Sequence, residues 1–240
     1  MRIALFSDVH ANAVAFEAML EDLGRQTVDS VVCLGDHVQG GPQPVECFDL
    51  VQGLGCPVVM GNSDYFVLTL DPGEEQEGEA QKETVRWTQA QLGEERLEAV
   101  GRFEPTVEVD LGEGKTLLAF HATPRSREEV IEPGTGEEAF RAPFAGLDAA
   151  VFAGGHTHQQ WARRCGDAYY VNPGSVGLAY DHYQDEKSFR ADPYAEYAIL
   201  TADESIGVEF RRIAFDREQA LRAIESAEMP HPELSTRLWR

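Results

Sequence analysis

Seven side chains that can ligate a metal ion follow short apolar runs of the sequence. They are Asp8, His10, Asp36, Asn62, His121, His156 and His158. The runs cover residues 3–6, 31–34, 58–60, 117–120 and 151–153, and each stops one to three residues before a ligand type. Such runs predict buried strands, and α/β sheets bind ligands beyond the carboxyl ends of their strands. We therefore expect the seven side chains to meet at one site.

The chemistry of this set indicates divalent transition-metal ions. Carboxylates, imidazoles and an amide oxygen suit Mn²⁺, Fe, Co²⁺, Ni²⁺ or Zn²⁺ better than Ca²⁺, and the set contains no thiolate that would select zinc. Asp8 and His10 are two residues apart, as are His156 and His158, so each pair would project the same way if strand geometry persists. Seven ligands exceed the need of one ion, which favours two ions bridged by one carboxylate.

The elements that must position these residues can be read from apolar periodicity. Residues 1–6, 11–24 and 30–34 predict a strand, a helix and a parallel strand. Further strands are expected at 56–60, 106–111, 117–121, 149–153, 161–163, 169–171, 194–201 and 208–213. Further helices are expected at 45–54, 82–92, 94–100 and 216–227.

Composition excludes several classes of protein. The length of 240 residues suits one α/β domain over 1–240, and the acidic stretch Asp71–Glu83 predicts a mobile surface insertion. A formal charge of −22 disfavours long nucleic acids and anionic membranes as partners. The four cysteines form no C-x-x-C pair, and no run approaches the roughly 18 apolar residues of a spanning helix. We expect a cytoplasmic protein whose cysteines stay reduced.

Five motifs in order give the chain a resemblance to the calcineurin-like metallophosphoesterases, in particular their small bacterial and archaeal members. The motifs are Ser7-Asp8-Val9-His10, Gly35-Asp36, Gly61-Asn62-Ser63-Asp64, His121-Ala122-Thr123-Pro124 and Gly155-His156-Thr157-His158. Gly41-Pro42 and the stretch Asn172–Gly177 extend the resemblance. The resemblance implies a four-layer αββα sandwich of two mixed sheets flanked by helices.

The resemblance also implies roles for single residues. Asp8, His10 and His158 would hold one metal ion, and Asn62, His121 and His156 a second, with Asp36 bridging both. Mn²⁺ is the first choice for the two ions, with Fe, Zn, Ni or Co as alternatives. A hydroxide shared by the ions would attack the phosphorus of a small phosphomonoester or phosphodiester in line. The candidate catalytic residues are Asp36, Asn62, Asp64 and His121, and the candidate substrate contacts are Asn62 and Arg125.

The chain departs from the family at Ser63, where many members have a histidine that protonates the leaving alcohol. A serine hydroxyl is a poor acid at neutral pH. Either the leaving group departs unaided, as a nitrophenolate would, or another group supplies the proton. Asp64 is more often a structural hydrogen-bonding residue than an acid.

Other polar residues have simpler interpretations. We expect His37 to face away from Asp36, His182 and His231 to lie on the surface, and Asn12 to cap the helix that follows it. The Asn172–Gly177 stretch predicts a turn that shapes the rim of the site.

Three functions stay open at this stage. A phosphoesterase for small molecules leads because all seven ligand positions are filled. A protein phosphatase and an interaction scaffold without catalysis are the alternatives. The sequence does not decide the native metal, the physiological substrate, the preference for monoesters or diesters, the general acid or the oligomeric state.

Overall fold

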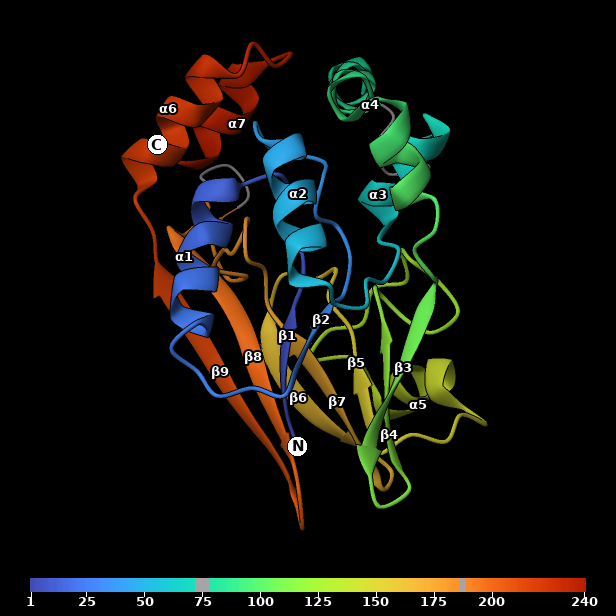
Figure 1. The fold of residues 1–240 in the computed structure, drawn as a ribbon. Helices are drawn as coiled ribbons and strands as arrows, with labels where there is room; N and C mark the ends of the chain where they lie inside the picture. Colours follow the sequence, from blue (N-terminus) through green and yellow to red (C-terminus); the bar gives the residue numbers. More distant parts are fainter. Residues whose placement is uncertain (72–77, 186–188) are drawn as a thin grey trace.

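Two mixed β-sheets form the centre of the molecule (Figure 1). The structure is a computed structural model, and it describes residues 1–71, 78–185 and 189–240. The first sheet has the strand order β2-β1-β8-β9, with β1 at Arg2–Phe6, β2 at Ser30–Cys33, β8 at Tyr194–Ala202 and β9 at Ile206–Ala214. β1 and β2 pair in parallel, as expected of the strand–helix–strand unit, and β8 is antiparallel to β1 and β9.

The second sheet has the strand order β3-β4-β5-β7-β6. Its strands are β3 at Thr106–Gly112, β4 at Lys115–Phe120, β5 at Val151–Ala153, β6 at Gln160–Cys165 and β7 at Ala168–Pro173. The short central strand β5 is parallel to both of its neighbours, whereas β3–β4 and β6–β7 are antiparallel hairpins. The β3–β4 turn is Glu113-Gly114, where both residues have positive φ as two-residue hairpin turns require.

Apolar clusters hold the layers together. Leu5, Leu34, Leu117 and Leu200 are buried in a cluster that joins the two sheets. Helices α1 at Ala13–Leu23 and α2 at Pro44–Leu54 cover the other face of the first sheet. Helix α5 at Glu137–Arg141 and the 3₁₀ turn Ala142–Phe144 cover the second sheet through an aromatic cluster. The order helix, sheet, sheet, helix is the expected αββα arrangement.

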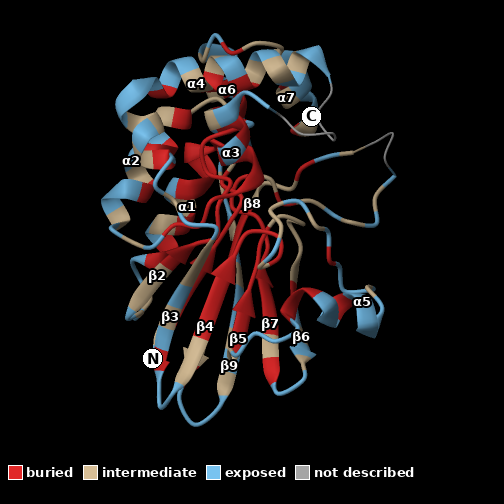
Figure 2. Ribbon diagram, turned by 90° about the vertical axis from the view of Figure 1, so that its right-hand side faces the viewer, coloured by how far each residue is buried: buried red, intermediate tan, exposed pale blue. Residues whose placement is uncertain are grey.

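Four further helices lie beyond one end of the sheets (Figure 1). They are α3 at Asn62–Thr69, α4 at Glu79–Val100, α6 at Arg217–Ser226 and α7 at Pro232–Leu238. α3 and α4 share one small apolar cluster, and α6 and α7 share another that includes Trp239. Figure 2 shows buried residues along the strands and in the loops next to these helices. No helix of the described ranges is long and apolar enough to cross a membrane.

The strand predicted at 56–60 does not form a ladder. Val58 makes one isolated bridge with Cys33, and Val59 makes one with Glu104. Pro57 has no N–H to donate, and its carbonyl accepts from Cys33 N at 3.1 Å. Single bridges on either side keep the segment extended, so it still delivers Gly61 and Asn62 to the end of the sheet.

The helices differ from expectation in their number and in where α4 begins. α3, α5 and α7 were not predicted, because Tyr65–Leu68 is a continuous apolar run without helical spacing and the other two helices are short. α4 begins at Glu79, inside the stretch 71–83 that was expected to be an insertion, and residues 72–77 of that stretch lie outside the described residues. The predicted break between two helices falls at Gly93, which has a φ of 69°.

A buried carboxylate links α1 to the first sheet. Asp22 accepts hydrogen bonds from Tyr197 Oη at 2.6 Å and from the Arg211 guanidinium at 2.8 and 3.0 Å. The hydrogen bond from Arg211 is the main reason that the pKa of Asp22 lies below its usual value. Helix α1 starts after the Asp8–His10 loop, so this link helps to fix the helix that follows the site.

Replacement of Asp22 by asparagine should therefore lower the free energy of unfolding at pH 7 by about 1–3 kcal/mol. A carboxyl with a lowered folded pKa stabilises the protein above its unfolded pKa of about 3.9, and this contribution is lost as the pH falls through the folded value. The difference between Asp22→Asn and the wild type, measured by urea unfolding, should shrink in acid. The control Glu21→Gln removes an exposed pair with Arg25 and should cost less than about 0.5 kcal/mol. Equal effects of both variants would contradict this role of Asp22.

Candidate metal centre

The first group of candidate ligands consists of Asp8, His10 and His158. Asp8 Oδ1 lies 3.7 Å from His10 Nε2 and 3.2 Å from His158 Nε2. The two Nε2 atoms are 3.0 Å apart. The three residues thus bring one ligand atom each into a single compact set.

The contacts of the two imidazoles indicate which ring nitrogen would face a metal ion. His10 Nδ1 lies 3.0 Å from the carbonyl oxygen of Gln39, and His158 Nδ1 lies 2.9 Å from that of Leu178. A carbonyl only accepts, so Nδ1 carries the proton of each neutral ring and Nε2 presents a lone pair. Both lone pairs face each other and Asp8 Oδ1, a buried oxygen without a hydrogen-bond partner. Three electron-pair donors that converge in this way fit a metal ion.

The second group contains Asp36, Asn62, His121 and His156. His121 Nδ1 is 2.8 Å from the carbonyl oxygen of Leu34, which again leaves Nε2 to face the site. This Nε2 lies 2.9 Å from Asn62 Oδ1 and 3.3 Å from Asp36 Oδ2. The His156 ring centroid is 5.2 Å from that of His121. The structure therefore brings all four predicted residues to one place.

The two groups adjoin each other at Asp8. Its Oδ1 is 4.0 Å from His121 Nε2, and Asp8 belongs to both sets of three ligand atoms, the second being Asp8, Asp36 and His121. The resemblance assigned the bridge to Asp36 instead. Two carboxylates thus lie between the imidazoles of the two groups, and either has the chemistry to bridge two ions.

Burial and charge act against each other in the second group. Burial lowers the pKa of His121, but the carboxylates of Asp36 and Asp8 raise it to about 10. Burial raises the pKa of Asp36, and the adjacent His121 brings it far below its usual range. Burial and the charge on His121 lower the pKa of His156 to about 4. The carboxylates of Asp36 and Asp8 thus favour a positive charge next to them. A bound cation would supply that charge.

The backbone of the ligand residues is unusual. Asp8, His10, Asp36, His156 and His158 all have positive φ, between 47° and 68°. Residues with side chains rarely adopt this conformation, and its concentration here indicates that the surrounding structure enforces it. Gly61 and Gly155 provide the space, because a Cβ on either would lie 2.0 Å from Asp36 Oδ1 or Ser7 Oγ.

This backbone corrects one step of the sequence argument. The condition that strand geometry persists through Asp8–His10 and His156–His158 is not met, because β1 ends at Phe6 and β5 ends at Ala153. Asp8 and His10 still face one point, but they do so through a loop with positive φ. His156 and His158 separate, the first toward His121 and the second toward Asp8.

Ser63 and Asp64 hold Asp36 in place. Ser63 donates its backbone N–H to Asp36 Oδ1 at 2.9 Å and its hydroxyl to Asp36 Oδ2 at 2.8 Å. Asp64 is fully buried and accepts from the backbone N–H groups of Asp36, His37, Val38 and Gly61. The Ser63 hydroxyl therefore points at a carboxylate and not at a leaving group, a contact for which the sequence carries no signal.

The other residues singled out in the sequence have the following contacts. Asn12 caps α1 through Ala15 N at 3.1 Å, and His37 is packed between Phe48 and Phe103. Arg125 is exposed and donates from Nε and Nη2 to Glu129. His182 stacks on Tyr180, and His231 pairs with Glu83 at 2.7 Å.

The Asn172–Gly177 turn contacts the loop that carries Asp8. Ser175 Oγ donates a hydrogen bond to the Asp8 carbonyl oxygen at 2.7 Å, so this turn helps to hold the Asp8 loop in place.

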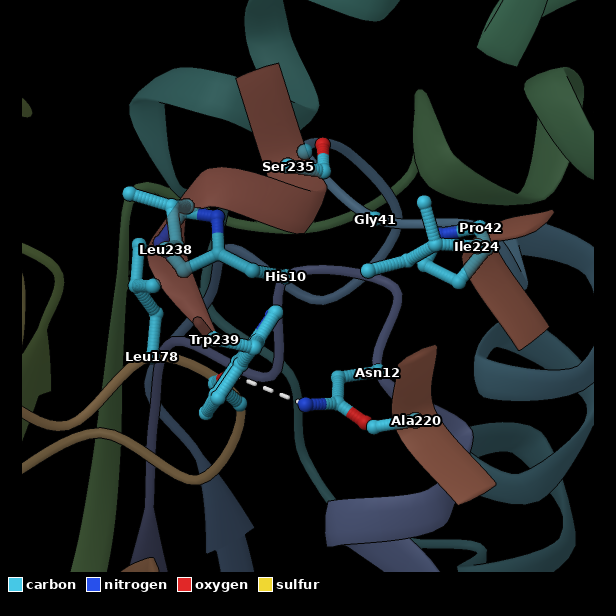
Figure 3. Close-up of a pocket in the computed structure, with 12 residues that line it drawn as sticks. His10, Asn12, Gly41, Pro42, Leu178, Ala220, Ile224, Ser235, Leu238 and Trp239 are labelled. Carbon is cyan, nitrogen blue, oxygen red and sulfur yellow. Dashed lines mark hydrogen bonds between the residues drawn. The ribbon is translucent and has the colours of Figure 1, made fainter. Parts of the chain in front are cut away.

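A small cavity of about 60 Å³ lies on the far side of His10 (Figure 3). Helices α6 and α7 contribute Ile224, Leu238 and Trp239 to its walls, and Asn12 donates to the Gly177 carbonyl at 3.0 Å beside it. The C-terminal helices thus help to enclose His10.

Comparisons with known proteins agree with this architecture. The model of the calcineurin-like phosphoesterase superfamily domain matches residues 1–205. A protein of Methanocaldococcus jannaschii is 30% identical over 226 residues, covering 85% of this chain and 91% of that protein. The metallophosphoesterase of Sphaerobacter thermophilus is 30% identical with a TM-score of 0.76, covering 99% of this chain and 98% of the other. A hypothetical protein of Pyrococcus horikoshii shares the fold at 18% identity, with a TM-score of 0.83 and coverage of 99% and 97%.

Metal analysis of two carboxylate variants should distinguish the two possible bridges. If Asp36 is shared, Asp36→Asn should retain fewer than one of two Mn²⁺ ions per chain after desalting, because its loss weakens both positions. Asp8→Asn should then mainly lose the ion held with His10 and His158. Inductively coupled plasma mass spectrometry gives the counts, and the exposed Asp148→Asn is the matched control. Loss of both ions in Asp8→Asn, with one retained in Asp36→Asn, would make Asp8 the bridge.

Proposed function

The chain belongs to the calcineurin-like phosphoesterase superfamily, and from this membership we propose that it is a dinuclear-metal phosphoesterase that hydrolyses small phosphomonoesters or phosphodiesters. The observation that carries the proposal is the convergence of imidazole Nε2 atoms on Asp8 and Asp36, with the Nδ1 atoms of His10, His121 and His158 directed at backbone carbonyls. Rings held through Nδ1 in this way present Nε2 to a metal ion.

The residues that would hold the ions follow from the two groups. Asp8, His10 and His158 would hold one ion, and Asn62, His121 and His156 the other, with Asp36 shared. Mn²⁺ is the proposed ion, and Fe, Zn, Ni or Co also suit these ligands. When bound, such ions supply Lewis acidity, which orients phosphate oxygens and lowers the pKa of water.

The chain's own residues position the reacting groups. Ser63 fixes both oxygens of Asp36, and Asp64 ties the Asp36 loop to Gly61 through backbone N–H groups. This supports a positioning role for Asp64 in place of the acid role that the sequence left open. Asn62 directs its Oδ1 at His121, so its Nδ2 is the group that can donate to a phosphate oxygen.

Within the described part of the chain, neither Ser63 nor Asp64 is free to protonate the leaving group. The Ser63 hydroxyl is used by Asp36, and both Asp64 oxygens accept from backbone N–H groups. We infer that the reaction depends on how well the leaving oxygen carries negative charge. Esters with stabilised leaving groups, or strained cyclic diesters, suit such a site best.

Two alternative functions are supported less well than this one. A scaffold without catalysis has no need for seven complete ligand positions with matched tautomers. A protein phosphatase is compatible with the same centre, and a panel of phosphopeptides and small esters separates the two activities. The cytoplasmic location and the absence of nucleic acid among the substrates stay predictions.

Hydrolysis of 4-nitrophenyl and ethyl esters of phosphate tests the proposal. With added Mn²⁺ the wild type should hydrolyse 4-nitrophenyl phosphate or bis(4-nitrophenyl) phosphate. The corresponding ethyl esters should react more slowly than these nitrophenyl esters by at least the factor of about 10²–10⁴ that general acid catalysis would otherwise contribute. Chelation with EDTA or the change Asp36→Asn should remove activity, whereas the control Asp148→Asn should not. An Asp36→Asn variant with full turnover, or equal rates for nitrophenyl and ethyl esters, would contradict the proposal.

A further inference from the structure

A second cavity, of about 120 Å³, adjoins the candidate metal centre on the side of His121. Its walls are Pro105, His121 and the segment Thr123–Arg127. His121 is the one candidate metal ligand among these walls in the described part of the chain. The cavity is therefore a neighbour of the metal centre that shares one side chain with it.

The segment that forms most of this cavity is a rigid turn. Thr123 N donates to Ser126 O at 2.9 Å, and Ser126 N donates to Thr123 O at 3.2 Å. Ser126 Oγ accepts from the backbone N–H groups of Glu128 and Glu129, both at 3.1 Å. These bonds fix the backbone on both sides of Arg127, so its side chain starts from a defined position.

The two arginines of the turn differ in their partners. Arg125 at the tip is paired with Glu129, which also accepts from Thr123 Oγ1 at 2.8 Å. Arg127 has no carboxylate within 4.0 Å in the described ranges, although the chain has 42 acidic residues and 20 basic ones. Its Nε is buried and has no hydrogen-bond partner. Among the described residues, the positive charge of Arg127 thus has no carboxylate partner.

An aromatic ring keeps Arg127 in place. The guanidinium carbon lies 4.6 Å from the ring centroid of Tyr65, which belongs to the same helix as the candidate ligand Asn62. A contact with an aromatic face helps to hold the guanidinium, and the two terminal Nη groups are then the donors that can serve a ligand in the cavity. A planar set of donors beside a cavity is the arrangement that binds an oxyanion.

We propose that Arg127 binds a second acidic group of the substrate, a carboxylate or a phosphate placed a short distance from the phosphate that reacts. This inference rests on the proposed function, because it takes the reacting phosphate to lie between the two ligand groups. His121 borders both the metal centre and the cavity. A short chain of substrate atoms would therefore be enough to join the reacting phosphate to an anionic group in the cavity. The substrate class is therefore a phosphate ester with a second anionic group.

Binding of phosphonates tests this inference without hydrolysis, because the carbon–phosphorus bond is not an ester. Phosphonoacetate, 3-phosphonopropionate and methylenebisphosphonate carry a second anion, whereas ethylphosphonate has a methyl group in its place. Titration calorimetry of the Mn²⁺-loaded protein, corrected for chelation of free Mn²⁺, gives each Kd. The wild type should bind at least one dianionic probe about 10–100 times more tightly than ethylphosphonate, the range of a hydrogen bond to a charged group. The carboxylate and bisphosphonate probes distinguish the two kinds of anion.

Arg127→Met should abolish this preference and leave the Kd of ethylphosphonate unchanged. Arg127→Lys keeps the charge without the planar donors and should retain part of the preference. Arg222→Met is the matched control, since Arg222 is exposed on α6, pairs with Asp216 and does not line this cavity. The inference is overturned if the wild type shows no preference, if Arg127→Met keeps it, or if Arg125→Met removes it instead. It is also overturned if Arg127→Met weakens all probes equally, because Arg127 would then contact the reacting phosphate.

Parallel assays with 4-nitrophenyl phosphate separate this inference from the proposed function. An inactive protein that shows Arg127-dependent binding would contradict the phosphoesterase function and keep the anion site. An active enzyme without that preference would contradict the anion site alone.

Discussion

The structure depends on a backbone constraint at the ends of two sheets. Five of the seven candidate ligands hold a positive φ, a conformation that costs an ordinary residue about 1–2 kcal/mol. Hydrogen bonds between loops enforce it: Asp8 N donates to Gly35 O and His10 N to Asp36 O, both at 3.0 Å. The loops after β1 and β2 therefore support each other. Neither loop would keep its ligands in position if the other were rebuilt.

The same constraint explains the electrostatics of the centre. The rings of His10, His121 and His158 each face a backbone carbonyl with Nδ1, so the fold directs Nε2 of each ring into the centre. These Nε2 atoms and two buried carboxylates lie within a few ångströms of one another. Buried carboxylates need positive charge beside them, as the raised pKa of His121 shows, and bound cations would supply that charge, which is why a metal-dependent reaction suits the centre.

Much of this arrangement could be predicted from the sequence. Buried strands that end one to three residues before Asp8, Asp36, His121 and His156 predicted that these side chains meet, because parallel strands end at a common edge. The loop conformations could not be predicted, since positive φ at non-glycine residues arises from long-range hydrogen bonds. The contact of the Ser63 hydroxyl with Asp36 could not be predicted either, because the two residues are 27 positions apart in the sequence. The pairing of Arg125 with Glu129 and the free Nε of Arg127 also appear only in three dimensions.

The most direct test of a preorganised dinuclear centre is an anomalous difference map from crystals grown with Mn²⁺. The account predicts two peaks about 4 Å apart, one contacting Asp8, His10 and His158 and the other contacting Asn62, His121 and His156. The five ligand residues with positive φ should keep that backbone in the absence of metal. A single peak, peaks outside this cluster, or ligand loops that rearrange when metal is removed would contradict it.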